Sequence, residues 1–243
     1  MDVCRWQDVP GGYENRRDGV ERSVTSATSG PLVARRGWRD AWAWMRWDVP
    51  TRIVLLIAAP LIWIAVAGID PLAIGLRFDF YLRDWLLIAL LAVGAGLVSL
   101  AYRRWLWRPR TAPDRSALAL ELPFFVVLNP VAEELFFRGA ALFGLANFVG
   151  MPWAIAITSV VFGVHHALAR FPVSFLVLGT LGGAMFGIMT AYYWSIVPAI
   201  VMHAAADLAI FVAAGHMARR AWANDSPQGV EPPPVDRLAA PTP

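Results

Sequence analysis

The sequence contains one cysteine and no lysine, and charged residues of either sign are scarce. The cysteine, Cys4, lies in a polar N-terminal stretch, which excludes disulfide frameworks, four-cysteine zinc sites, iron–sulfur clusters and a catalytic thiol inside an apolar segment. All 21 basic residues are arginines and the formal net charge is only +3, without a basic stripe interleaved with aromatic residues along a polar face. Nucleic acid is therefore not expected as a partner.

The composition is instead dominated by apolar residues. With 58% hydrophobic residues, 16% charged residues and a mean hydropathy of +0.51, the chain is too apolar for an ordinary soluble domain. Runs that could cross about 30 Å of hydrocarbon lie at residues 53–68, 85–102, 117–148, 153–168, 173–194 and 196–215. They predict an all-α fold, a polytopic transmembrane bundle of about six helices in the cell (inner) membrane.

Two of these runs have features of their own. The third is longer than one perpendicular span requires and contains Asn129-Pro130 near its centre. A break or kink is predicted there, because proline lacks a backbone donor and disfavours helix at the preceding residue. In the fifth run, Gly179, Gly183 and Gly187 recur every four residues and form a small face that another helix can approach closely.

The polar ends and the spans divide the chain into four parts. Residues 1–50 are predicted to form a cytoplasmic tail with an interfacial segment, residues 51–116 two accessory transmembrane helices, residues 117–215 the core, and residues 216–243 a disordered tail. The interfacial segment, residues 35–48, interleaves arginines with tryptophans. This pattern favours a helix lying at the level of the lipid headgroups.

The arginines near the ends of the spans are distributed unequally. With six spans, one side would carry Arg35, Arg36, Arg39, Arg46, Arg52, Arg103, Arg104, Arg108, Arg110, Arg115, Arg170, Arg219 and Arg220. The other side would carry Arg77 and Arg83, offset by Asp70, Asp79 and Asp84. Because cytoplasmic loops are enriched in basic residues, both termini are predicted to be cytoplasmic.

Ionisable residues inside apolar spans are costly and therefore indicate function. The first such cluster is PVAEELFFRG, in which Glu134 and Arg138 are four residues apart in the order that favours an ion pair within one helix. Glu133 has no such cation nearby in sequence and is the candidate general base. In the alternative interpretation, both acids decorate the first turn of a helix capped by Asn129, with Pro130 at its first position.

Two further clusters contain histidine. In FGVHHAL, Phe162 and His166 share a helix face while His165 is rotated away, so His166 is the better candidate; a pair of histidines at the membrane interface is the alternative. In HAAAD, His203 and Asp207 are four residues apart. That pair could orient an imidazole, hold a metal or form a self-contained buried hydrogen bond.

The three clusters in this order, Glu-Glu-x-x-x-Arg, Phe-x-x-x-His and His-x-x-x-Asp, resemble the motif set of the CPBP family. This family of intramembrane proteases includes the type II CAAX prenyl proteases and the Abi-like, bacteriocin-processing proteins. The resemblance covers about residues 117–214. The last motif position is often asparagine in the family and is Asp207 here, which leaves open whether this group donates a hydrogen bond or acts as an anion.

The resemblance implies hydrolysis of a peptide bond inside the membrane. Glu133 would be the general base that activates a water, and His166 would bind that water or shuttle its proton. Arg138 would hold Glu134 and the local helix in place. Phe162 would support the site as the aromatic member of its motif.

For the last motif, the resemblance implies that His203 and Asp207 stabilise the oxyanion, which an aspartate can do only if it is protonated or works through His203. The cofactor stays open, because family members have been described both as metalloproteases and as metal-free glutamate and histidine enzymes. His166, His203 and a carboxylate could hold a divalent metal such as zinc, although the HExxH spacing is absent.

The substrate expected from the resemblance is a peptide or membrane protein, prenylated or bacteriocin-like, reached from the lipid bilayer. Two other classes of function compete with a protease. An ion-coupled transporter would use buried acids and histidines as a relay. A non-catalytic membrane scaffold or immunity protein would retain the polar core for folding alone.

Overall fold

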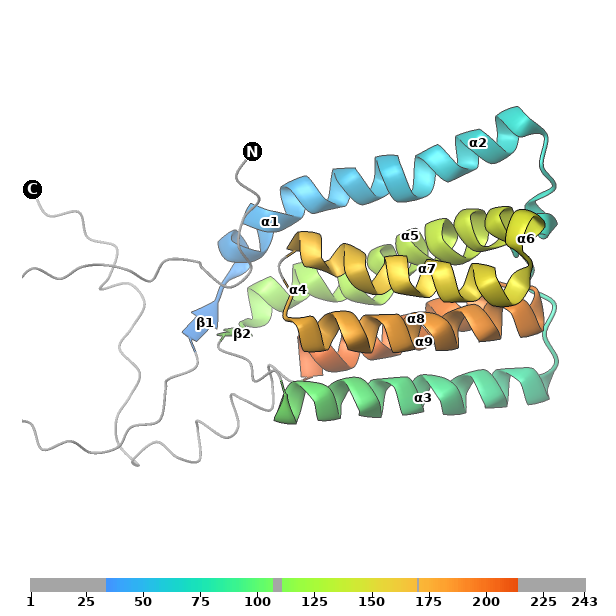
Figure 1. Cartoon of the computed structure of the whole chain (residues 1–243). Coiled ribbons are helices and arrows are strands. Elements are labelled where there is room, and N and C mark those ends of the chain that lie inside the picture. The colour runs from blue at the N-terminus through green and yellow to red at the C-terminus, as the bar shows by residue number, and fades with distance from the viewer. Residues whose placement is uncertain (1–33, 107–110, 170, 214–243) are drawn as a thin grey trace, which may run out of the picture.

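The computed structural model describes residues 34–106, 111–169 and 171–213, and in this part the chain is a bundle of helices lying side by side (Figure 1). Five helices are long and apolar enough to cross a membrane: Trp38–Ala67, Leu82–Trp105, Arg115–Val149, Met151–Ala169 and Val173–Tyr193. A sixth, Val197–Phe211, is apolar but shorter. The predicted all-α bundle of about six helices is confirmed.

Several of these helices are built from consecutive segments. The first comprises α1 (Trp38–Thr51), the π-helical η1 (Arg52–Ala58) and α2 (Ala59–Ala67). The short η2 (Pro71–Ile74) and α3 (Leu82–Trp105) follow. The third long helix comprises α4 (Arg115–Pro123), η3 (Phe124–Leu128), α5 (Asn129–Glu134), η4 (Leu135–Leu142) and α6 (Phe143–Val149). The last elements are α7 (Met151–His165), η5 (His166–Ala169), α8 (Val173–Tyr193), α9 (Val197–Asp207) and η6 (Leu208–Ala213).

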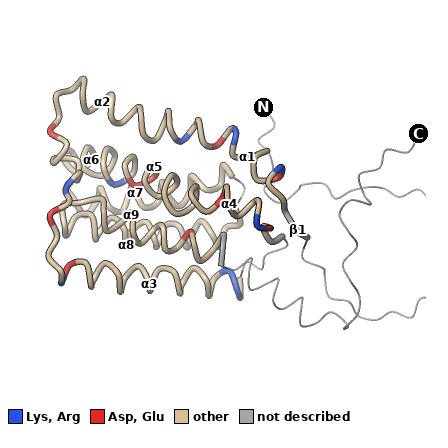
Figure 2. Tube along the Cα trace, turned by 180° about the vertical axis from the view of Figure 1, so that it is seen from behind, with Lys and Arg blue, Asp and Glu red and all other residues tan. Residues whose placement is uncertain are grey.

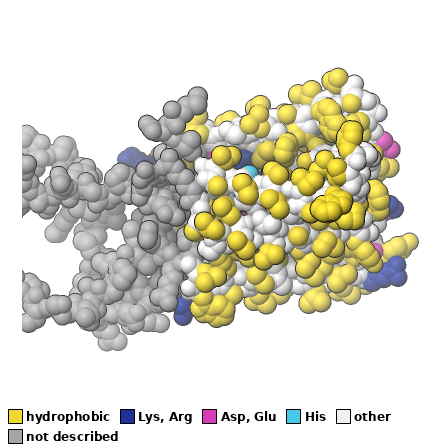
Figure 3. All heavy atoms as spheres, viewed as in Figure 1, with side chains coloured by type: hydrophobic (Ala, Val, Ile, Leu, Met, Phe, Trp, Pro, Cys, Tyr) yellow, Lys and Arg dark blue, Asp and Glu magenta, His cyan; other side chains and the backbone are white. Residues whose placement is uncertain are grey.

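The outer surface of the bundle is apolar (Figure 3), and its interior holds polar groups among hydrophobic side chains. Hydrophobic side chains cover much of the visible lateral face, and charged side chains gather mainly at the two ends (Figure 3). The interior, by contrast, holds ionisable and polar side chains. In a low-dielectric surrounding such groups are tolerated only when they pair with one another, which makes the interior the place to look for chemistry.

The helix at Pro130 differs from the sequence prediction. No break occurs, because Arg115–Val149 runs as one helix of 35 residues. The missing donor of Pro130 is accommodated by the wider π-helical turns of η3 just before it. Asn129 is also not a helix cap, since its side chain is committed to Asp207 in another helix.

The tryptophan-rich α1 differs in a similar way, because it is continuous with the first span rather than a separate helix. One face of α1 packs on the third long helix, where Ala41 and Met45 join the buried cluster around Phe124. Trp44 meets the Phe124 ring edge-on at 4.9 Å. Trp47 is exposed on the other side of the helix. A headgroup-level position for this segment remains a prediction.

A two-stranded parallel pair at one end was not expected from the sequence. β1 (Ala34–Arg36) pairs with β2 (Thr111–Pro113), which joins the approach to the first helix to the approach to the third. Basic residues gather near this end of the bundle, while acidic residues are prominent at the opposite end (Figure 2). The cytoplasmic placement of this end stays a prediction. The predictions that involve the tails, Arg108, Arg110, Arg170, Arg219 and Arg220 lie outside the described residues.

Candidate active site

Two adjacent acids in the middle of the bundle have different partners. Glu134 is fully buried and forms the expected ion pair with Arg138, whose Nη1 lies 3.1 Å from the carboxylate. Its Oε1 also accepts a hydrogen bond at 2.7 Å from Nδ1 of His203, on α9. Glu134 therefore joins two helices and holds one histidine in a defined orientation.

Arg138 is fixed by more than its acidic partner. Its Nη2 donates to the carbonyl of Gly183 on α8 at 3.1 Å, and its guanidinium lies 4.1 Å from the centre of the Phe162 ring. A Cβ at Gly183 would lie 3.1 Å from the same Nη2, so the predicted glycine face of α8 leaves room for the arginine. Phe162 thus supports Arg138 through a cation–π contact.

Glu133 is only 2% exposed and does have a cationic partner, which comes from the first helix. Arg52 donates a hydrogen bond from Nη1 to Glu133 Oε1. It donates a second one from Nε to Asp48 Oδ2, at 2.5 Å. In the sequence, Arg52 has the character of a flanking arginine only, because its partner lies 81 positions away. The second carboxylate oxygen, Oε2, has no hydrogen-bond partner among the described residues and lies 3.7 Å from His203 Nε2.

The two adjacent histidines both contribute, contrary to the expectation that His165 points away. His165 Nε2 lies 3.6 Å from Glu133 Oε1. The Nδ1 atoms of His165 and His166 lie 2.5 Å and 2.8 Å from the carbonyl of Phe162. The physical reason is that His165 follows Phe162 by three residues within the regular helix α7, and residues three apart lie on the same helix face just as residues four apart do. Because a carbonyl can only accept, both Nδ1 atoms carry hydrogen, and in the neutral imidazole Nε2 then keeps the lone pair.

His203 and Asp207 do not form a self-contained pair. His203 Nε2 is 3.6 Å from Asp207 Oδ2, too far for a hydrogen bond. Asp207 Oδ2 instead accepts a hydrogen bond at 2.6 Å from Nδ2 of Asn129. The His203 ring stacks on Phe186 with centroids 5.4 Å apart. Both groups are thus anchored by other residues, and the region around His203 Nε2 faces Glu133.

Within the described part of the chain, the donors that converge well enough to hold a metal are Glu133, His165 and His166, whose ligand atoms all lie within 4.8 Å of one another. This group shares His166 with the set expected from the sequence and has His165 where His203 was expected. One carboxylate and two neutral imidazoles, each with its Nδ1–H on a backbone carbonyl, form a donor set that suits zinc. The residues present therefore fit a divalent metal.

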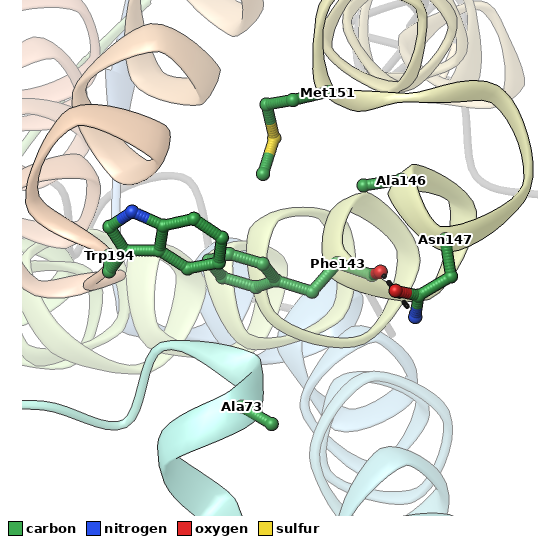
Figure 4. A pocket seen from close by; sticks show the side chains of 6 residues that line it. All are labelled: Ala73, Phe143, Ala146, Asn147, Met151 and Trp194. Atoms are coloured by element: carbon green, nitrogen blue, oxygen red, sulfur yellow. Dashed lines mark hydrogen bonds between the residues drawn. The ribbon is translucent and has the colours of Figure 1, made fainter.

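The bundle also has a hollow at the end away from the strand pair, of about 370 Å³. Its walls are Ala73, Phe143, Ala146, Asn147, Met151 and Trp194, and Phe143 and Trp194 lie side by side in it (Figure 4). No ionisable side chain lines it, so it cannot activate water. In the nearby connection before α3, hydrogen bonds of 2.5 and 2.6 Å from Arg77 hold the pKa of the Asp79 carboxyl below its ordinary value.

Comparison with known proteins agrees with the geometry. Residues 115–209 match the family model described as Type II CAAX prenyl endopeptidase Rce1-like. This segment is similar to that family. The resemblance to CPBP proteases is thereby confirmed over residues 115–209, and the apolar helices support an integral membrane protein. No curated protein and no solved structure matches the chain.

The Rce1-like region contains the three motifs but not the whole polar cluster. Arg52 belongs to the first helix, outside the matched residues. Sequence reasoning also gave Asn129 only a capping role and set His165 aside. The one sequence feature that could have pointed to Arg52, Asn129 and His165 is their polarity. All three lie within or at the edge of apolar runs, where a polar side chain is costly without a partner.

Proposed function

We propose that this protein is an intramembrane endopeptidase in which Glu133 activates a water for attack on a peptide bond. The observation that carries the proposal is the unpartnered Oε2 of Glu133, buried in the bundle and facing His203 Nε2 at 3.7 Å. A carboxylate oxygen without a hydrogen-bond donor is free to accept a proton. The partly exposed His165, and histidine atoms visible on the lateral face in Figure 3, support access from that side.

In the proposed reaction, the water lies beside Glu133 Oε2, in the space that His203 also faces. Glu133 Oε2 takes one proton from the water as its oxygen attacks the carbonyl carbon. The water's other hydrogen is donated to the Nε2 lone pair of one α7 histidine, His165 or His166, which orients the water. Glu133 then returns the proton to the leaving amine, so the peptide bond is hydrolysed without net gain or loss of protons.

The negative charge that develops on the carbonyl oxygen requires a donor, and His203 in its protonated, imidazolium form is the best placed. Its Nδ1–H donates to Glu134, which directs its Nε2–H toward the space beside Glu133. Asp207, anchored by Asn129, would act through His203 rather than as a direct donor. Removing one preorganised donor of this kind typically lowers kcat by about 10²–10³-fold.

The same donor set is compatible with a metal-assisted reaction. Glu133, His165 and His166 would hold the ion, with the Phe162 carbonyl as the outer support of both histidines. A bound zinc would supply Lewis acidity and lower the pKa of its water to about 7. Whichever route is used, Arg138 and Glu134 keep the helices and His203 in place.

The proposed substrate is a peptide or membrane-protein segment, with a prenylated CAAX-type C-terminus as the first candidate. We also propose that both termini lie on the cytoplasmic side, because the arginines near the ends of the spans gather on the side of the termini. The matched protease family and the unpartnered base favour this function over a transporter or an inert scaffold.

The test is cleavage of a fluorogenic prenylated CAAX-type peptide and of a proteome-derived peptide pool by the detergent-purified full chain. Glu133→Gln should abolish cleavage, and Asn147→Ala, in the hollow at the other end, is the matched control. Zinc content is measured on the same samples. Cleavage that survives in Glu133→Gln, or a folded wild type that cleaves nothing in either set, would refute the proposal.

A further inference from the structure

The first helix, outside the Rce1-like region, contributes a buried cation to the polar cluster. Arg52 is the first residue of η1, and its side chain is only 18% exposed. It contacts Glu133 on α5 and Asp48 one turn earlier in its own helix. Its guanidinium also lies 5.4 Å from the centre of the Phe124 ring. An arginine that only marked the membrane boundary would extend toward water and would not point into the bundle.

The contact with Arg52 divides the two oxygens of Glu133 between different tasks. Oε1 accepts from Arg52 and has His165 Nε2 at 3.6 Å. Oε2 has no hydrogen-bond partner among the described residues and faces His203. A glutamate side chain rotates about several bonds, so without Arg52 either carboxylate oxygen of Glu133 could face His203. The guanidinium restricts the side chain to one arrangement.

We propose that Arg52 is a positioning residue that holds Glu133 by one oxygen and thereby presents the other to the reacting water. This inference rests on the proposed function, in which Oε2 is the proton acceptor. Asp48 assists by holding Nε of Arg52 at 2.5 Å, so the arginine cannot swing away from the bundle. The working unit then includes the first helix as well as residues 115–209.

The kinetic test uses the full chain in detergent and compares Arg52→Gln, Arg52→Lys and Asp48→Asn with the wild type. Arg52→Gln should lower kcat by about 10- to 100-fold with KM changed by less than about threefold, because orientation affects the chemical step. Arg52→Lys should restore part of the rate, and Asp48→Asn should have a smaller effect. Arg46→Gln, on the same helix and stacked on Trp47, is the matched control with unchanged kinetics.

Some results would overturn the proposal. A normal kcat in Arg52→Gln would show that Glu133 needs no such anchor, and a raised KM at unchanged kcat would assign Arg52 to substrate binding instead. Inactive Glu133→Gln together with normal Arg52→Gln would refute this inference alone. Active Glu133→Gln would refute the proposed function itself.

A thermal-unfolding cycle tests the pair without any substrate. Arg52→Gln leaves Glu133 buried without its cation, and Glu133→Gln leaves Arg52 with Asp48 as its remaining acidic partner, so each change should lower the melting temperature. The double variant should lose less than the sum of the two. Additive losses would mean that the two side chains do not interact in the folded protein. That result would overturn the proposal even if no cleavable peptide were found.

Discussion

The interior cluster around Glu133 and the hollow beside Trp194 are both places where a ligand could be sought, but they differ in what they offer. The hollow has about 370 Å³ of space and walls without an ionisable group. The cluster brings three histidines and several carboxylates within a few ångströms of one another. The difference teaches that in a membrane bundle the chemistry follows the buried polar groups rather than the open space.

The largest expected effect is on the stability of the cluster. Arg138→Met should lower the free energy of unfolding by about 3–5 kcal/mol, because Glu134 would remain buried without its cation. Unfolding followed by tryptophan fluorescence in detergent measures the loss. The double variant Glu134→Gln, Arg138→Met should be more stable than Arg138→Met alone; an equal loss would mean that the burial of an unpaired acid is not the cause.

Next in size is the effect of removing the donor that faces Glu133. His203→Gln should reduce kcat by about 10²–10³-fold, the usual value of a preorganised oxyanion donor. Peptide cleavage under saturating substrate measures it. Trp194→Phe, which retains an aromatic ring in the hollow, should leave kcat unchanged. If both variants behaved alike, the distinction drawn between the two regions would fail.

A smaller effect separates the two histidines of α7. His165→Gln should lower turnover by at least about tenfold, since it removes the imidazole whose Nε2 lies 3.6 Å from Glu133. If a metal is bound, the same change should lower its affinity, which equilibrium dialysis with zinc measures alongside the cleavage rate. Wild-type turnover and zinc content in this variant would restore the original expectation that only His166 takes part.

The smallest effect is expected at the end with the hollow. Asp79→Asn should leave turnover unchanged and lower the melting temperature at pH 7 only slightly, because its ion pair with Arg77 is exposed. Since hydrogen bonds from Arg77 lower the pKa of Asp79, the pair stabilises the fold above the ordinary carboxyl pKa of about 3.9, and its contribution is lost as the pH falls through the lowered value. The melting temperatures of Asp79→Asn and the wild type, measured between pH 7 and pH 3, check this prediction. A large difference between the two proteins at pH 7 would contradict it.

The features that could be predicted are those that depend on neighbours along the helix. Length and apolar composition predicted the spans, and a spacing of four residues predicted the Glu134–Arg138 ion pair, which forms. The break at Pro130 was wrong because flanking π-helical turns accommodate a proline within one continuous helix. The orientation of His165 was wrong because residues three apart on a regular helix, such as Phe162 and His165 in α7, also share a face.

The sequence by itself determined an apolar helical bundle with acids, an arginine and histidines inside it, since hydropathy and helical spacing are local properties. Only the tertiary structure decided which of these groups meet. Arg52 reaches Glu133 across 81 positions, Asn129 reaches Asp207 across 78, and His203 reaches Glu134 across 69. Such pairs depend on how the helices rotate and slide against one another, because each buried polar group must find its partner in a neighbouring helix.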